Sequence, residues 1–287
     1  QYLFRVSIDS AERMFEVCAY IRKNVNDSDD ILLDYIVAHE FSSFILEGAM
    51  KILTLELLLS HDYKKSIVDA YNVNSVVKNI LESGDEVDFA VAYNKKLLRE
   101  IRDYESFRVN EHLYFTLLPK YQNYILGDVL TEISNRQSDF WYFGGKDLGS
   151  GDSFGAEPLF QCDIDTIKEY CLRESKGCLP YRLAYLAPVF DYSDKDEPSF
   201  SQFFYWLLEH FDSFKEKEEI LSEFSSNMGS YSWVGSIIPL LEKKIKCFKK
   251  LEDNMNPMVK KWVNGNILSL SEQLRREQNA ESYRKLC

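Results

Sequence analysis

Apolar residues recur every three or four positions along most of this sequence, and this spacing strongly limits the folds open to it. Residues three and four apart share one face of an α-helix, so the spacing predicts amphipathic helices. Alternation of apolar and polar residues, which marks a half-buried strand, is scarce. Only 12 glycines and 7 prolines occur among 287 residues, too few for a turn-rich all-β protein. The sequence therefore predicts an all-α fold.

The pattern is clearest in two helices near the C-terminal end, expected over residues 236–253 and 257–279. Asn256 and Pro257 supply an N-cap and a first-turn proline for the second helix. The apolar stripe of the first helix consists of Ile237, Leu241, Ile245, Phe248 and Leu251. The stripe of the second consists of Val259, Val263, Ile267, Leu270 and Leu274. Because the joint between them is short, we expect an αα-hairpin.

Further helices are predicted along the rest of the chain. In the helix expected over residues 40–60, the spacing predicts that Phe41, Ile45, Ala49 and Ile52 share a stripe. The other predicted helices cover residues 9–24, 63–70, 73–83, 87–101, 105–118, 120–134, 163–175, 178–187, 199–213 and 216–228. Successive helices with short joints predict an irregular α-solenoid of HEAT-like stacked hairpins, with a compact helical bundle as the alternative.

A glycine-rich segment, residues 138–158, interrupts the helices and contains five of the twelve glycines. A loop of this length is unusual inside a compact domain. We therefore expect it to separate an N-terminal helical subdomain, residues 1–137, from a HEAT-like subdomain, residues 159–287.

The same segment contains candidate binding residues. Trp141 and Tyr142 lie beside Lys146, and exposed aromatics next to a loop are frequent partner contacts. A phosphate-binding P-loop would require Ser or Thr after the lysine, whereas Asp147 follows here. A nucleotide-dependent enzyme with its site at this loop is kept as an alternative.

The charge of the chain is uneven. The net charge is −12, which would repel a polyanion on average. Residues 215–287, however, contain 13 Lys or Arg against 10 Asp or Glu. Lys243, Lys246 and Lys250 are candidate partner contacts in this basic part, although such a run is most often the solvated face of a helix. A nucleic-acid-binding helical module that uses these lysines is a second alternative.

No pattern identifies a catalytic residue, a cofactor site or a metal site. The spacing of the six cysteines matches no zinc or redox motif, which indicates reduced thiols and a cytoplasmic protein. The histidines form no ligand pair, and the acidic clusters at 27–34 and 191–197 lack the central glycine of a calcium loop. No apolar run reaches membrane-spanning length. The chain begins with Gln and without a signal peptide, so we expect it to be a piece of a longer protein.

The segment GSYSWVGS, residues 229–236, suggests a corner between two helices. Gly229 can end one helix and Ser236 can cap the next, with Pro239 in its first turn. Trp233 would then cover the joint, and direct contact with a partner is the alternative role for it.

The C-terminal region resembles a known class of helical repeats. The similar stretches are RLAYLAPVF (182–190), GSYSWVGSIIPLLEKKIKCFKKLED (229–253) and NPMVKKWVNGNILSLSEQLRREQ (256–278). The residues that carry the similarity are Gly229, Ser230, Trp233, Gly235, Ser236, Pro239, Asn256, Pro257, Val259 and Trp262. They resemble the HEAT-like region that ends many large bacterial multidomain proteins, several of them in anti-phage defence systems. The resemblance implies sensing, scaffolding or regulation rather than catalysis.

Together these observations predict a non-catalytic helical-repeat module that binds a macromolecule, with a protein as the expected partner. The resemblance adds the expectation of a C-terminal sensor or regulatory region in a bacterial defence protein.

Overall fold

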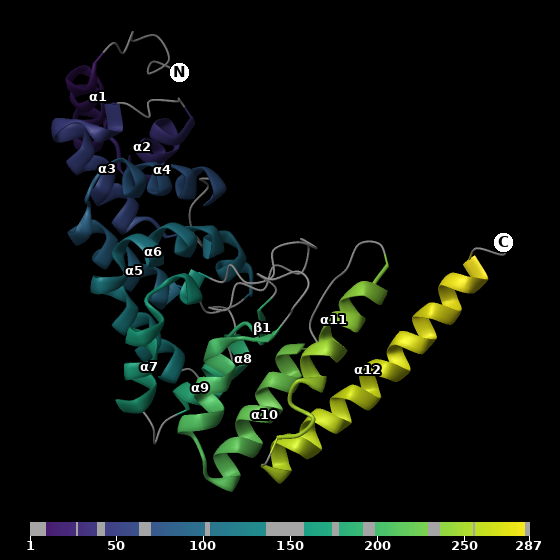
Figure 1. The fold of residues 1–287 in the computed structure, drawn as a ribbon. Coiled ribbons are helices and arrows are strands. Elements are labelled where there is room, and N and C mark those ends of the chain that lie inside the picture. The colour runs from purple at the N-terminus through teal and green to yellow at the C-terminus, as the bar shows by residue number, and fades with distance from the viewer. Residues whose placement is uncertain are drawn as a thin grey trace. The chain divides into compact units, whose positions relative to one another are not determined.

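The protein is almost entirely helical in the part that the computed structural model describes, which confirms the predicted all-α class (Figure 1). The described residues are 10–26, 28–38, 44–62, 70–100, 104–135, 158–173, 178–191, 199–228, 236–254 and 256–284. The chain divides into two compact units, Gln1–Val129 and Leu130–Cys287. The division falls inside a helix; the predicted separating segment 138–158 lies, apart from Pro158, outside the described residues.

In its described residues, the N-terminal unit is built from helices and one short 3-10 turn. Its elements are α1 (Ala11–Asn24), α2 (Ser28–Ala38), η2 (Phe44–Leu46), α3 (Gly48–Ser60), α4 (Ala70–Ser83), α5 (Val87–Glu100) and the first part of α6 (Tyr104–Asn135). Ser10 caps α1, because its Oγ accepts a hydrogen bond from the backbone N of Arg13 at 3.2 Å. Asp29 and Asp30 lie in the first turn of α2, where carboxylates favour the helix dipole.

Helix α3 differs from the prediction in both its start and its buried face. Gly48 has a φ of 46°, a left-handed value that suits glycine, and α3 begins there rather than near residue 40. Ile45 of the predicted stripe is buried, but it lies in η2 before α3. Within α3, Ala49 is exposed and Ile52 is 62% exposed, so the predicted face of this helix is not the buried one. The residues of α3 that are buried are Met50, Leu53, Thr54, Leu57 and Leu58. Phe41 lies outside the described residues.

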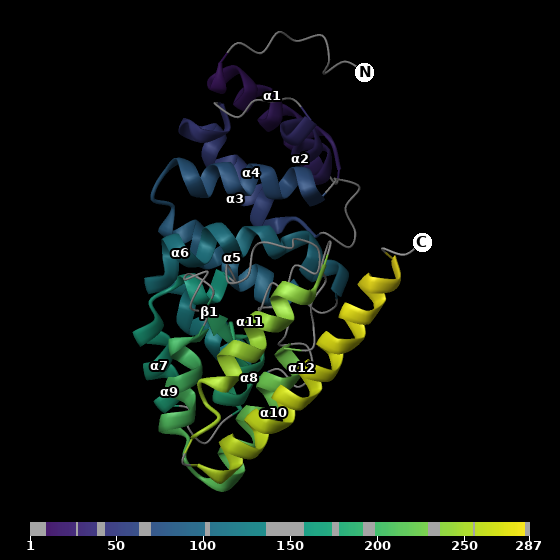
Figure 2. The ribbon, with the colours of Figure 1, turned by 45° about the vertical axis from the view of Figure 1, so that its right-hand side comes forward.

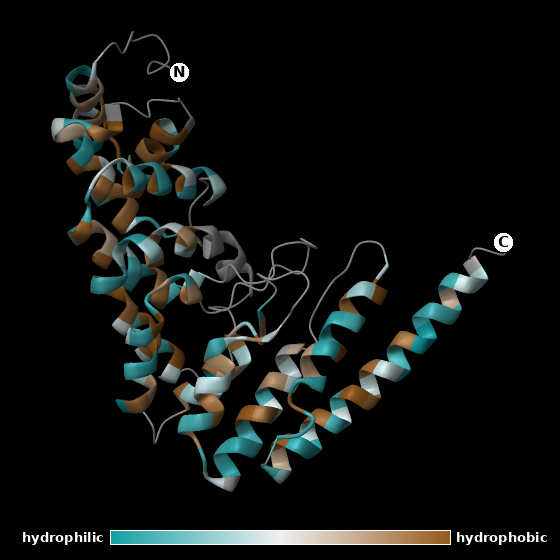
Figure 3. Ribbon diagram, in the orientation of Figure 1, coloured by the Kyte–Doolittle hydropathy of each residue, from teal (hydrophilic) through white to brown (hydrophobic). Residues whose placement is uncertain are grey.

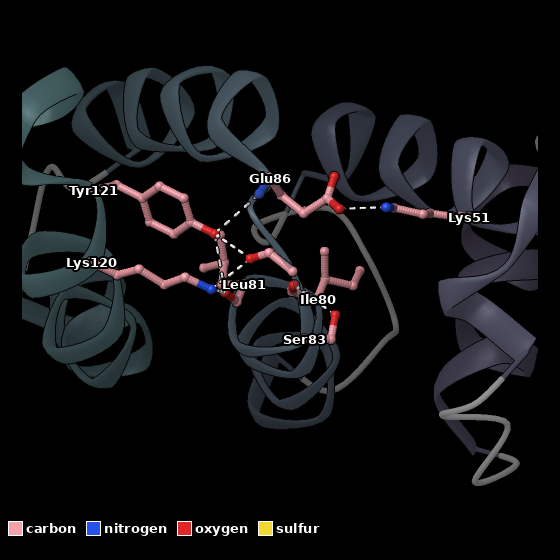
Figure 4. Close-up of polar contacts among 8 residues, drawn as sticks. Lys51, Ile80, Leu81, Ser83, Glu86, Lys120 and Tyr121 are labelled. Carbon is pink, nitrogen blue, oxygen red and sulfur yellow. Dashed lines mark hydrogen bonds and ion pairs between the residues drawn. The ribbon is translucent and has the colours of Figure 1, made fainter.

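A kink in α6 brings two side chains to the end of α4 (Figure 4). Pro119 lacks a backbone N–H, and two residues later Tyr121 departs from helical geometry with φ −117° and ψ 18°. The Tyr121 hydroxyl lies 3.0 and 3.2 Å from the carbonyl oxygens of Leu81 and Gly84. Lys120 Nζ donates to the same two carbonyls. These contacts satisfy carbonyl groups that the helix end leaves without intrahelical donors.

The C-terminal unit contains the end of α6 and a further series of helices, which Figure 2 shows from a second direction. Its other elements are η4 (Pro158–Gln161), α7 (Ile164–Arg173), α8 (Leu179–Leu186), β1 (Phe190–Asp191), β2 (Ser199–Phe200), α9 (Gln202–His210), α10 (Phe214–Met228), α11 (Ile238–Lys249) and α12 (Pro257–Arg284). The two strands pair antiparallel, with Phe190 opposite Phe200. Helix α10 packs against both α8 and α12.

An aromatic cluster joins the last four helices of this unit. The Phe200 ring stacks on Phe204 at 4.3 Å between centroids and meets the edge of Phe248 at 5.1 Å. Trp262 of α12 lies 5.1 Å from Phe248, and its indole Nε1 donates to Ser225 Oγ of α10 at 2.8 Å. The cluster therefore ties α12 to α9, α10 and α11 through both ring packing and a hydrogen bond.

Candidate interaction surface

Helix α11 carries the candidate lysines on the side opposite its core contacts. Leu241, Ile245 and Phe248 are buried, as the predicted stripe requires. Lys243, Lys246 and Lys250 follow at spacings of three and four residues, which places them within about 60° of one another around the helix. Lys246 and Lys250 are exposed and Lys243 is half-buried. We call these three residues the lysine stripe.

An aromatic side chain of α9 lies within electrostatic range of Lys250 in the lysine stripe. Tyr205 of α9 is 41% exposed. Burial raises the pKa of its hydroxyl, and the positive charge of Lys250 opposes that rise, which places the two side chains within electrostatic range. The surface thus combines cationic groups with a partly exposed ring.

Lys244, another basic residue of α11, is buried, unlike the residues of the lysine stripe. Its side chain is only 4% exposed, and burial lowers its pKa to about 8. Its Nζ donates to the carbonyl oxygen of Met228 at 3.3 Å and lies 5.8 Å from the centroid of the Phe190 ring. Met228 ends α10, where the helix dipole favours a cation. Position 244 is three residues from Leu241 and four from Phe248, and this spacing could have revealed its burial.

Helix α12 begins as predicted and then continues past the helix on which it packs. Asn256 caps it, accepting from the backbone N of Met258 at 3.0 Å. Its 28 residues span about 42 Å, against about 18 Å for the 12 residues of α11. Figure 3 shows apolar residues recurring between polar ones along α12.

The predicted stripe of α12 is buried only at its start. Val259 and Val263 are 2% and 0% exposed. The later stripe residues are half-buried, namely Ile267, Leu270 and Leu274. The second half of α12 therefore presents part of its apolar face to solvent.

The structure does not place the other predicted contact residues on this surface. Trp141, Tyr142, Lys146 and Trp233 lie outside the described residues. Of the sequence-predicted set, the structure therefore brings together the lysine stripe alone.

Four of the five cysteines in the described residues are buried and do not resemble reactive thiols. Burial raises the pKa of Cys18, Cys162 and Cys247 to about 11 and that of Cys171 to about 12. Cys178 is exposed. Raised pKa values leave little thiolate, the form that attacks electrophiles and binds metals. Within the segments that the structure describes, there is also no group of three or more metal-ligating side chains.

The described helices include none with the length and apolar content needed to cross a membrane. Comparison with protein-family models, with curated proteins and with solved structures finds no match to this chain.

Proposed function

We propose that this chain is a non-catalytic helical module that recognises a protein with an acidic surface. The observation that carries the proposal is the lysine stripe, which lies on the side of α11 opposite Leu241, Ile245 and Phe248. Tyr205 adds a partly exposed ring of the kind that contributes strongly at protein interfaces. Opposite charges on a partner would steer its approach to this surface.

A protein is favoured over a nucleic acid because of the charge of the whole chain. The net charge of −12 opposes a densely charged polyanion, whereas a short acidic helix or loop meets mainly the local field of the lysine stripe. Nucleic-acid binding through the same three lysines is the alternative outcome of the experiment below.

We also propose that the helical hairpins of this chain stack on one another. The support for this stacking is the α11–α12 hairpin and the packing of α10 against both α8 and α12, since neighbouring hairpins that stack in this way expose a continuous surface. A role as the C-terminal sensor or regulatory region of a bacterial defence protein is supported by the sequence resemblance within residues 182–278.

The test uses two fluorescent probes: a glutamate-rich helical peptide of 20 residues and a single-stranded DNA of 20 nucleotides. Fluorescence anisotropy measures their affinity for the wild type and for the variant K243E/K246E/K250E. Each exposed charge pair contributes up to about 1 kcal/mol, so we expect the triple reversal to weaken peptide binding by about 10- to 100-fold. Equal reversal at three exposed lysines of the other unit, K23E/K78E/K95E, controls for the change in net charge.

The proposal fails if the wild type does not bind the peptide, or if the control variant loses as much affinity as the stripe variant. Tighter binding of the DNA than of the peptide, lost in K243E/K246E/K250E, would establish the nucleic-acid alternative instead.

A further inference from the structure

A stripe of glutamates on α10 has the same spacing as the lysine stripe on α11. Glu216, Glu219 and Glu223 follow one another at intervals of three and four residues, which are the intervals of the lysine stripe. This spacing places the three glutamates within about 60° of one another around the helix and along about 10 Å of its axis. All three are half-buried, and the side chain of Glu219 is 41% exposed. We call them the glutamate stripe.

The glutamate stripe concentrates negative charge beside α8. Burial raises the pKa of the Tyr181 hydroxyl of α8, and the negative charges of Glu219 and Glu216 raise it further. Burial also raises the pKa of the Glu223 carboxyl, and the charge of Glu219 adds to that rise. Neighbouring carboxylates of the stripe therefore repel each other, and a cation brought from outside would relieve that repulsion.

Two contacts of the glutamate stripe are with near neighbours in the sequence. Oε1 of Glu219 lies 3.7 Å from Nζ of Lys215, whose side chain is 84% exposed. Oε2 of Glu216 accepts a hydrogen bond from the backbone N of Ser213 at 3.1 Å, just before α10 begins. An exposed ion pair such as that of Lys215 and Glu219 contributes little. The glutamate stripe therefore keeps much of its capacity to attract a cationic surface.

We propose that the acidic partner of the lysine stripe is a second copy of this chain, whose glutamate stripe lies against it. The inference rests on the proposed function, because it assigns a chemical identity to the partner proposed there. Charge complementarity carries it: two parallel helices lying side by side would oppose three ammonium groups to three carboxylates at matching intervals.

Such a contact joins two different surfaces and is therefore head to tail. A pair of chains joined in this way still has one lysine stripe and one glutamate stripe for further copies. Association then continues beyond the dimer, either to a closed ring or to an open chain of copies.

Sedimentation equilibrium of the full chain tests the proposal. At 100 mM salt the Debye length is about 10 Å, so the repulsion between two acidic chains is largely screened. Concentrations from about 10 µM to about 1 mM cover weak complexes. We expect the average mass of the wild type to rise with concentration. The variants K243E/K246E/K250E and E219K/E223K should each associate about 10- to 100-fold more weakly.

The change in net charge is controlled in both directions. The variant K23E/K78E/K95E has the same net charge as K243E/K246E/K250E and should associate as the wild type does.

The variant E219K/E223K instead brings the net charge from −12 to −8, so weaker association cannot come from general repulsion. It also leaves Glu216 in contact with Ser213 at the start of α10.

A mixture of the two stripe variants separates charge complementarity from misfolding. In the mixture, the new glutamates on α11 of one variant face the new lysines on α10 of the other. Opposite charges then meet again, so we expect the mixture to associate about 10-fold or more tightly than either variant alone. Variants that had lost their fold would not recover association on mixing.

Binding of the glutamate-rich peptide distinguishes this inference from the proposed function. E219K/E223K retains the lysine stripe and should still bind the peptide, and the peptide should disperse the wild-type oligomers. A wild type that binds the peptide and yet stays monomeric up to about 1 mM overturns the second copy as partner and leaves the proposed function standing. Association that survives either charge reversal, or a mixture that fails to associate, also overturns it.

Discussion

Lys244 and Lys246 lie two positions apart on α11, yet the first is buried and the second is exposed. Successive helical residues are rotated by about 100°, so these two point to nearly opposite sides. The difference decides what each amine does. Lys246 belongs to the lysine stripe, while Lys244 holds the end of α10 through the carbonyl oxygen of Met228.

The buried amine of Lys244 predicts a specific pH dependence of stability. Its pKa is lowered from 10.5 to about 8, so between those values the unfolded chain binds the proton and the native chain has released it. Stability should therefore rise as the pH increases from 8 to 10.5. Replacement by Met keeps the volume and removes the charge. We expect Lys244→Met to raise the free energy of unfolding at pH 7 by about 2 kcal/mol, after loss of the hydrogen bond to Met228.

Urea denaturation at pH 7, 8 and 10 measures this effect. The exposed lysine substitution Lys246→Met is the control, for which we expect a change within about 0.5 kcal/mol. A Lys244→Met variant that is destabilised at pH 7 would show that the charged amine stabilises the native state. A variant that keeps the wild-type pH dependence would show that another group is responsible for it.

The helices differ in how far the sequence predicts them. The α11–α12 hairpin could be predicted because Asn256 and Pro257 mark a helix start and apolar residues occupy one face on each side of it. Helix α3 is apolar almost all round, so spacing alone could not tell whether Met50 or Ile52 faces the core. Only the packing of α1, α2 and α5 against it decides that face.

The candidate site, too, could be predicted from the sequence only in part. The lysine stripe could be predicted, because a regular helix fixes where Lys243, Lys246 and Lys250 point. The proximity of Tyr205 to Lys250, and the contact of Lys244 with Met228, could not be predicted. Their members come from separate helices, and no local spacing relates positions that tertiary packing brings together.

Helix α12 predicts different mutational effects at a buried position of its apolar stripe and at an exposed position outside the stripe. Val263 has no exposed surface, whereas Leu268 is 64% exposed. Val263→Ala removes buried methyl groups and leaves a cavity, so we expect a loss of about 2 kcal/mol in the free energy of unfolding. Leu268→Ala removes a larger group from water-exposed surface, and its effect should stay within about 0.5 kcal/mol. Thermal or urea denaturation of both variants tests this difference. Equal losses would mean that Leu268 is covered in solution.

At the scale of the whole molecule, the lysine stripe is a local basic area on a chain with a net charge of −12. Charges beyond a Debye length, about 10 Å at 0.1 M ionic strength, contribute little at physiological salt and more at low salt. The acidic remainder of the chain should therefore slow the approach of an acidic partner in dilute buffer. Contacts at the lysine stripe itself should instead determine how long the partner stays bound.

Removing negative charges outside the lysine stripe separates these two effects. The variant E209Q/E218Q/E272Q changes three exposed glutamates of the C-terminal unit and brings the net charge to −9. At 20 mM salt we expect the association rate constant for the glutamate-rich peptide to rise about twofold, because long-range repulsion weakens. At 300 mM salt, where the charges are screened, the rate constant should equal that of the wild type. Stopped-flow anisotropy measures both rates. A change in the dissociation rate, at either salt concentration, would place one of these glutamates in the interface itself and would extend the recognition surface beyond the lysine stripe.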